Sequence, residues 1–463
     1  MDSRMNQFVR ISRKNSRYFE YEDGTPFVPV GMNLCFERFS GDDAEILAIY
    51  RRWFRRFSEN GGNFARIWLG VPFLNLEPEK PGVFSKRKLE NLRALVAFGR
   101  EYGIRLKFTL DHFRDLRPVR QAEMFPGAAC FQNRVYRREN GGFADTVEEF
   151  FNGEAARANF VRKLELLSRN FADEPAVMAW ELWNEVNCVG PVSLWKPWTE
   201  IMLGELHRLF PKQFALQSLG SFSDFYAYDL YDELASLEGN DFLQAHRYLD
   251  PGAEIDVCRG AMDLLCRSAV AELCRRCPER PAILAETGAV EWCHCRASHL
   301  YELDREGTLL HDALFAPFFA GSAGCGQFWH WDHIYVNRHD LWHHFGWFAR
   351  AIAGIDPAAE DYRPELRENR RLRFHILRGN SHDLVWLRDK ADWADELDRG
   401  IAPERFAELR VPVEQLTAAP VSRVEFNSPW EDGAEQAAVP ENGVITFPPL
   451  PALPRRQALF LNR

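Results

Sequence analysis

The chain lacks the features that mark several classes of protein. No apolar run approaches the roughly 20 residues that a membrane-spanning helix needs, and residues 1–7 form no apolar leader segment. Basic residues are not in excess, because the net charge is −10. That charge argues against nucleic acid or an anionic membrane as a partner. We therefore expect a cytoplasmic protein, or a secreted or periplasmic one if a leader was removed.

The motifs of several enzyme classes are also missing. The sequence contains no Gly-rich phosphate loop, no His-Glu-x-x-His and no Gly-x-Ser-x-Gly. Ten cysteines scattered over 463 residues are typical of reduced thiols rather than of a disulfide framework. Cys274 with Cys277, and Cys293 with Cys295, suggest zinc, but the spacing of a four-ligand site is absent. We expect no metal and no organic cofactor, with a structural metal as the weaker alternative.

The chain does have many aromatic residues and enough apolar residues for a large core. Apolar residues make up 46% of the chain, which argues against general disorder. Of the aromatic residues, 14 are tryptophans. Most of them will be core, but the surplus fits a groove in which sugar rings stack on indoles.

Strand-like and helix-like segments alternate along the first three-quarters of the chain. This alternation predicts a closed parallel (β/α)8 barrel, a TIM barrel, over residues 1–360, preceded by an N-terminal β-hairpin. The expected strands are 27–33, 63–69, 104–110, 176–183, 213–219, 242–245, 282–285 and 326–331. The expected helices include 42–60, 86–102, 155–170, 195–210, 259–277 and 311–320.

Two further regions stand out from this alternation. An insertion at 112–150 follows the third strand, where loops of a barrel carry function, and we expect it to form a wall of the substrate groove. From about residue 371 the chain consists of short strands and turns. These predict a small C-terminal β-sandwich domain over 370–463, which we expect to brace the barrel rather than to bind carbohydrate.

Two glutamates follow buried apolar runs about 100 residues apart. Glu185 comes after Asn184 in the segment Trp-Glu-Leu-Trp-Asn-Glu, and Glu286 comes after the run 281–285. Gly288 is expected to allow a sharp turn that exposes Glu286. Paired carboxyls suit cleavage of sugar–sugar bonds, since one protonates the leaving oxygen and the other meets the cationic sugar carbon. Glu291 is a rival for the second position.

Other polar residues at strand ends are expected to support this pair. Glu181 lies four residues before Glu185, so strand alternation places it on the same face and deeper in the barrel. A buried Arg66 needs a carboxylate partner, which we expect to be Glu286, with Glu181 or Asp111 as alternatives. His246 and Tyr248 share a face of the sixth strand. We expect Tyr248 to hydrogen-bond the nucleophile and His246 to bind a sugar hydroxyl.

The remaining candidates are expected to contact the sugar itself. The amide of Asn184 is expected to hold the 2-hydroxyl, and either Trp329 or Trp331 is expected to form the floor of the site. Weaker candidates for sugar contacts are His112, Asn33, Trp183, Trp195 and Trp198.

These segments together resemble glycoside hydrolases of clan A, family 5, the cellulase and β-mannanase group. The similar segments are 23–33, 62–68, 179–185, 246–248 and 285–288, and 23–33 and 150–181 look most like β-mannanases. The resemblance implies a barrel that cleaves β-glycosidic bonds with retention, with Glu185 as acid/base and Glu286 as nucleophile. The chain departs from the family where Val186 replaces the usual proline and Thr287 replaces a phenylalanine or tryptophan.

We therefore expect a retaining β-glycoside hydrolase that cuts a β-linked glucan or mannan internally, by double displacement. An exo-acting β-mannosidase, β-glucosidase or β-galactosidase of the same clan is the first alternative. A glycan-binding barrel without catalysis is an alternative of another class. A metal-dependent barrel enzyme is a further one, but it would need several His, Asp or Glu ligands at strand ends.

Overall fold

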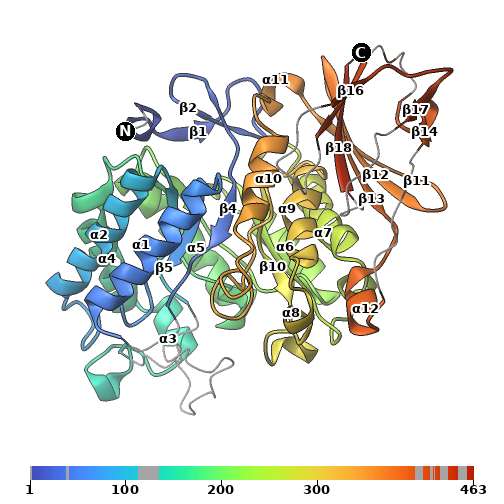
Figure 1. Ribbon diagram of the computed structural model, residues 1–463. Coiled ribbons are helices and arrows are strands. Elements are labelled where there is room, and N and C mark those ends of the chain that lie inside the picture. Colours follow the sequence, from blue (N-terminus) through green and yellow to red (C-terminus); the bar gives the residue numbers. More distant parts are fainter. Residues whose placement is uncertain are drawn as a thin grey trace.

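A parallel barrel forms the larger part of the molecule (Figure 1). The computed structural model describes residues 3–37, 41–112, 135–401, 410–417, 421, 423–427, 436–446 and 456–462. Five strands pair in sequence order, each parallel to the next: β4 (Gly31–Asn33), β5 (Phe64–Trp68), β6 (Arg105–Thr109), β7 (Val177–Glu181) and β8 (Phe214–Leu216). Strands β9 (Leu243–Leu249) and β10 (Ala282–Ala289) form a second parallel pair.

Backbone hydrogen bonds join these two groups of strands into one barrel. The Asp241 N–H donates to the Ala215 carbonyl at 3.1 Å, next to β8 and β9. On the other side an extended segment at 326–329 takes the place of an eighth strand. There the Trp329 N–H donates to the Thr287 carbonyl at 2.9 Å, and the Asn33 N–H donates to the Phe328 carbonyl at 3.3 Å. The predicted (β/α)8 barrel is therefore present.

Helices lie on both flanks of the barrel strands in the view of Figure 1. They are α1 (Asp43–Glu59), α2 (Lys86–Tyr102), α4 (Glu154–Phe171), α5 (Val192–Leu209), α6 (Tyr226–Ala235), α7 (Met262–Arg276), α9 (Thr308–Phe318) and α10 (His343–Ala351). Side-chain caps mark the starts of two of them: Asp42 and Glu45 form a capping box at α1, and Ser85 accepts from the Lys88 N–H at α2. The short helices are α3 (Val147–Asn152), α8 (Leu300–Leu303), α11 (Pro357–Glu360) and α12 (Trp393–Asp398).

The N-terminal segment covers one end of the barrel. Strands β1 (Val9–Ile11), β2 (Phe19–Tyr21) and β3 (Pro26–Phe27) form a small antiparallel sheet. The Phe19 ring packs against Phe214 at 5.5 Å and against Phe242 at 5.4 Å, near the starts of β8 and β9. The strand predicted at 27–33 is therefore split between β3 and β4. We therefore expect a functional site at the opposite end of the barrel, near α3 and α8 in Figure 1.

The C-terminal part is built on a six-stranded antiparallel sheet. Its order is β11 (Arg363–Glu368), β12 (Leu372–Arg378), β13 (His382–Asp389), β18 (Arg456–Asn462), β15 (Arg423–Asn427) and β16 (Gln436–Ala438). Strands β14 (Arg410–Pro412) and β17 (Val444–Thr446) form a separate pair. Val411 and Ile445 from this pair join the apolar cluster that includes Phe374 and Val385. The sheet is established, whereas a sandwich of two comparable sheets stays a prediction.

A buried ion network joins this sheet to the barrel. Asp263 on α7 accepts hydrogen bonds from Arg373 at 2.8 Å and from His375 at 2.9 Å. Arg388 on β13 lies 3.2 Å from Asp263 and 3.0 Å from Asp312 on α9. Burial lowers the pKa of His375 to about 4, although Asp263 opposes the shift, so His375 is neutral near pH 7. These contacts support the expected bracing role.

Breaking this network should destabilise the protein strongly. We expect Arg388→Met to cost about 3–5 kcal/mol, because it leaves buried carboxylates without their cation. The urea midpoint of unfolding measures the loss. Arg51→Met is the matched control, since its pair with Glu101 is exposed on both sides and should contribute under about 1 kcal/mol. Equal midpoints for the two variants would contradict the bracing role.

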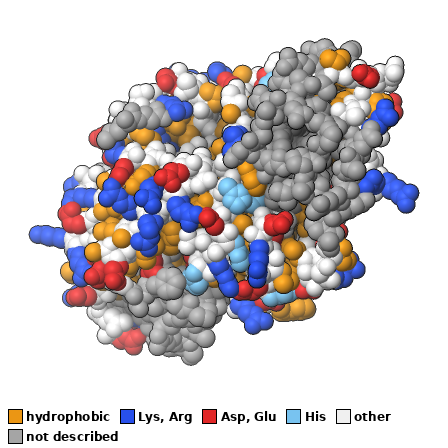
Figure 2. Space-filling model, in the orientation of Figure 1, with side chains coloured by type: hydrophobic (Ala, Val, Ile, Leu, Met, Phe, Trp, Pro, Cys, Tyr) orange, Lys and Arg blue, Asp and Glu red, His pale blue; other side chains and the backbone are white. Residues whose placement is uncertain are grey.

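The surface mixes charges of both signs. On the face shown in Figure 2, basic and acidic side chains are interspersed over the helices. Within the described chain, no helix combines the length and the apolar character that crossing a membrane requires.

Candidate active site

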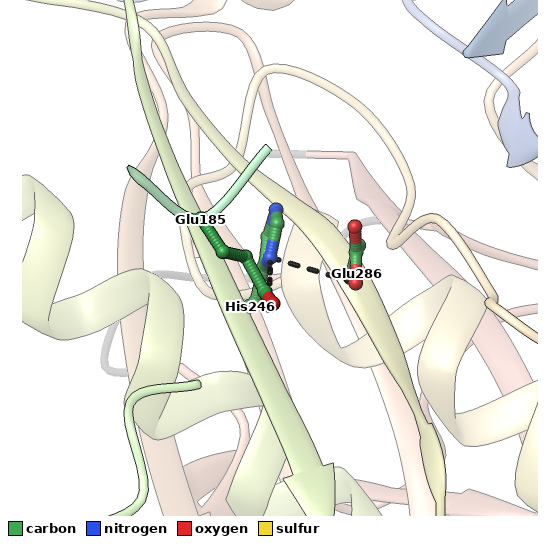
Figure 3. A group of neighbouring side chains, drawn as sticks. All are labelled: Glu185, His246 and Glu286. Carbon is green, nitrogen blue, oxygen red and sulfur yellow. Dashed lines mark hydrogen bonds and ion pairs between the residues drawn. The ribbon is translucent and has the colours of Figure 1, made fainter. Parts of the chain in front are cut away.

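Two glutamates and a histidine meet at the end of the barrel opposite the N-terminal sheet (Figure 3). Nδ1 of His246 lies 2.8 Å from Oε1 of Glu185 and 3.5 Å from Oε2 of Glu286. One ligand-type atom from each of the three residues lies within 4.8 Å of the other two. Carboxyl groups about 5–5.5 Å apart are typical of retaining glycosidases, whereas inverting enzymes need about 6.5–9.5 Å. The observed spacing fits retention.

Glu185 projects from a tight turn rather than from a strand. Strand β7 ends at Glu181, and Glu185 has φ 52, in the left-handed region. That conformation costs a non-glycine residue roughly 1–2 kcal/mol, so the surroundings must hold it. The Glu185 N–H donates to Ser218 Oγ at 3.1 Å, and the Asn184 N–H donates to the Asp111 carbonyl at 2.8 Å. The alternation argument that relates Glu181 to Glu185 therefore does not apply.

Glu286 lies within β10 and accepts hydrogen bonds on both of its oxygens. Arg66 donates to Oε1, and the Tyr248 hydroxyl donates to Oε2 at 2.7 Å. The side chain is 4% exposed. Burial raises the pKa of Glu286, while the charge of Arg66 and the hydrogen bonds from Tyr248 and Arg66 oppose that rise. These donors favour the ionised form of this carboxyl over that of its neighbour.

Among the described residues, no cation donates to Glu185 as Arg66 does to Glu286. Burial, and then the negative charge of Glu286, raise the pKa of Glu185 well above its usual value. Burial and the charge of Arg66 lower the pKa of His246 well below its usual value, so its ring is neutral. The proton shared by the two carboxyls therefore resides on Glu185, which suits a general acid.

Arg66 is held beneath the pair by four acceptor side chains, one of which is Asn33, whose Oδ1 accepts at 3.4 Å. Arg66 also donates to Glu181 at 2.5 Å and to Asn184 Oδ1 at 2.7 Å, in addition to Glu286. Arg66 therefore binds both Glu286, the partner expected from the sequence, and Glu181, the alternative. Although burial by itself raises the pKa of Glu181, Arg66 and Lys107 lower it well below its usual range. Lys107, 3.0 Å from Glu181, was missed, although a lysine inside a buried strand signals a paired carboxylate.

Several residues expected to contact sugar are fully buried. Trp331 is 0% exposed and packs against Phe36 and Trp53, so it does not line the site. Trp329, which is 5% exposed, lies at the rim beside Trp68 at 5.2 Å. Trp329 is therefore the better candidate for the floor.

His112 and Asn33 also support the site rather than face a substrate. His112 is 1% exposed and stacks on Trp68 at 5.1 Å. Asn33 is 0% exposed, and its Nδ2 donates to the Ala285 carbonyl at 3.0 Å. His246, which was expected to bind a sugar hydroxyl, contacts Glu185 instead.

Other expectations about this end of the barrel need correction. Strand β10 continues to Ala289, so Gly288 makes no sharp turn; a Cβ there would meet the Tyr301 hydroxyl at 2.8 Å. Glu291 binds His299 at 2.8 Å. The buried aromatic core contains Trp183, Trp195 and Trp198. Most of the insertion expected to form a groove wall, 113–134, lies outside the described residues.

The Glu185–His246–Glu286 group could also offer three ligand atoms to a metal ion. Both oxygens of Glu286 already accept hydrogen bonds from protein donors. The guanidinium of Arg66 next to Glu286 disfavours a second cation there. The arrangement therefore suits an acid–nucleophile pair better than a metal centre. Outside this group, the eight cysteines whose state is described are free thiols.

The chain is similar in sequence to plant mannosidases and in fold to glycoside hydrolases of known structure. No model of a known protein family matches the sequence. The chain is 26% identical over 192 residues to mannan endo-1,4-beta-mannosidase 2 of Oryza sativa subsp. japonica, which covers 40% of this chain and 41% of that protein. A glycoside hydrolase family 5 structure from Bacteroides vulgatus ATCC 8482 has a TM-score of 0.62 at 12% identity, over 99% of this chain and 94% of that one.

The resemblance to family 5 glycoside hydrolases is confirmed. The structural likeness concerns the fold, and it extends over the C-terminal part as well as the barrel. A second relative, mannan endo-1,4-beta-mannosidase 7 of Arabidopsis thaliana, is 23% identical over 58% of this chain and 65% of its own length. The chain spans less than two-thirds of the length of these relatives.

Proposed function

We propose that this protein is a retaining β-glycoside hydrolase that cuts β-linked mannan internally. The observation that carries the proposal is the pair of unequal carboxyls around His246. Burial and the charge of Glu286 raise the pKa of Glu185 well above its usual value, whereas hydrogen bonds from Arg66 and Tyr248 favour the ionised form of Glu286. A retaining mechanism needs this inequality, since one carboxyl acts as acid and the other as nucleophile.

The reaction runs in two displacements. The Glu286 carboxylate attacks the anomeric carbon while Glu185 gives its proton to the departing glycosidic oxygen. This step breaks the sugar–sugar bond and leaves a glycosyl ester on Glu286. Glu185 then takes a proton from water, whose oxygen attacks the same carbon and releases Glu286. Since Asn184 Oδ1 accepts from Arg66, its amide Nδ2 is left to donate to the 2-hydroxyl.

Mannan is the favoured substrate because the curated relatives described above are named mannan endo-1,4-beta-mannosidases. A β-glucan is the second choice, and exo-action on chain ends is the alternative mode. Defined β-1,4-linked manno- and gluco-oligosaccharides separate these possibilities when products are resolved by length. Internal cutting gives several oligosaccharides at early times, and exo-action gives one short product. Proton NMR of the first product should show the β-anomer, and an α-anomer would contradict retention.

A glycan-binding barrel without catalysis is the competing proposal. It would bind the same oligosaccharides without releasing any product. Binding alone does not require Arg66 and Tyr248 to donate hydrogen bonds to Glu286 while Glu185 lies beside the neutral ring of His246. Binding without turnover, over a panel of β-linked glycans, would favour this alternative.

The Tyr248 hydroxyl should set the acidic limb of the pH profile. Burial raises the pKa of Glu286, and the hydrogen bond from Tyr248 opposes this rise. The nucleophile must be ionised, so kcat/KM falls as pH drops through that pKa. Tyr248→Phe removes the bond, and we expect the acidic limb to move to higher pH with roughly tenfold lower kcat/KM at the optimum.

A matched control is available for this substitution. Tyr335 donates to another buried carboxylate, Asp304, at 2.5 Å. Tyr335→Phe therefore removes the same kind of bond away from the pair and should leave the acidic limb in place. An unshifted limb in Tyr248→Phe, or equal shifts in both variants, would show that Tyr248 does not tune the nucleophile.

A further inference from the structure

Strongly exposed aromatic side chains gather at the catalytic end of the barrel. Among the described residues, the exposed large hydrophobic side chains that are aromatic are Phe225, Tyr226 and Trp292, at 67%, 61% and 65%. Phe225 and Tyr226 lie at the start of α6, after β8, and Trp292 lies in the loop after β10. Loops at this end of a barrel carry function. Exposed aromatic surface placed there marks a binding region rather than core.

The loop that carries Trp292 is held firmly in place. Val290 and Ala297 form an antiparallel bridge, and the Glu291 N–H donates to the Arg296 carbonyl at 2.8 Å. The Glu291 carboxylate accepts from the His299 N–H at 2.8 Å. An indole on a braced turn loses little further freedom when it binds a ligand.

His294 ties this loop to both halves of the site. Its ring packs edge-on against Tyr248 at 4.8 Å, and Tyr248 holds Glu286. Its Nε2 lies 3.1 Å from Ser221 Oγ on the loop after β8. His294 has φ 60, a strained conformation that the surrounding contacts maintain.

These contacts place the loop of Trp292 beside the loop after β8, which also contacts the turn of Glu185. Trp329 and Trp68 lie on the side of β5 and of the segment that closes the barrel. The turn of Glu185 faces the other way, since Asn187 accepts from the Gly220 N–H at 2.7 Å on the loop after β8. The acid stands next to the departing oxygen. The leaving part of the chain therefore extends toward the loops after β8 and β10.

We propose that Trp292, with Phe225 on the neighbouring loop, binds the leaving-group side of the substrate chain. The proposal rests on the glycosidase function argued above. The apolar face of a β-linked pyranose would stack on the indole, as aromatic faces pack against C–H groups. Trp329 serves the other side, and the two indoles together define a cleft in which a chain can be cut internally.

Two substrates with the same glycone separate this role from a catalytic one. The first is the β-linked oligosaccharide that the wild type cleaves best, and the second is the matching β-glycosyl fluoride, whose leaving group carries no sugar. We expect Trp292→Ala to lower kcat/KM for the oligosaccharide roughly tenfold or more. The value for the fluoride should stay within about twofold of wild type. Phe225→Ala should act in the same direction.

Two further variants serve as controls. Trp292→Phe keeps an aromatic face and should retain most oligosaccharide activity. Ile201→Ala removes an exposed apolar side chain from α5 and should change neither substrate. Equal losses on both substrates, or none on either, would overturn the proposal while leaving the glycosidase function standing. A wild type that cleaves neither substrate would overturn the function itself, and the proposal with it.

Discussion

Glu286→Ala should lower turnover of a β-linked oligosaccharide by on the order of 10⁴-fold or more, because it removes the carboxylate that forms the glycosyl ester. Added azide should restore turnover by occupying the space of the missing carboxylate. Since azide attacks from the face that the nucleophile used, the product should be the α-glycosyl azide. Steady-state rates and NMR of the azide product measure both effects.

The matched control for this variant is Glu291→Gln. Glu291 was the rival nucleophile in the sequence, but its carboxylate binds His299 on the surface. We expect the control to keep activity within about tenfold of wild type. A full loss in Glu291→Gln, or wild-type rates in Glu286→Ala, would reverse the assignment.

Glu185→Ala should lower the rate on oligosaccharides by about 10²–10⁴-fold, the usual contribution of a general acid. Formation of the glycosyl ester from a β-glycosyl fluoride should be much less affected, because fluoride leaves without a proton. The high-pH limb should also disappear, since wild-type activity falls as pH rises through the raised pKa of Glu185.

Azide distinguishes the two glutamates from each other. In Glu185→Ala it should attack the glycosyl ester in place of water and give the β-glycosyl azide, the opposite anomer from Glu286→Ala. The two variants therefore serve as controls for one another. The same anomer from both would contradict the separate roles of acid and nucleophile.

The sequence predicted the barrel well because buried apolar runs and helical periodicity are local signals. Helices α6 and α10 were not among the expected helices. At 10 and 9 residues they are the shortest of the eight helices around the barrel, so they offer only a short periodic pattern. The rule that alternate residues of a strand share a face failed where the strands end. The Trp331 N–H donates to the Trp329 carbonyl at 3.1 Å, so the chain turns there and alternation no longer relates the two indoles.

The sequence predicted which residues form the site better than it predicted the contacts between them. Glu185, Glu286 and Tyr248 lie together because each follows or belongs to a barrel strand, and strand ends converge. The sharing of Arg66 between Glu181 and Glu286 could not be predicted, since it depends on distances across the barrel. The buried ion pairs of the C-terminal sheet were missed for the same reason.

Trapping the glycosyl ester tests the central claim most directly. A 2-deoxy-2-fluoro β-glycosyl fluoride of the preferred sugar slows the second displacement, so the intermediate accumulates and peptide mass spectrometry locates the attached sugar. The account predicts one sugar on Glu286 and release of active enzyme as the ester hydrolyses. A label on Glu185 or Glu291, or efficient turnover of natural substrate with an inverted anomer and no label, would contradict it.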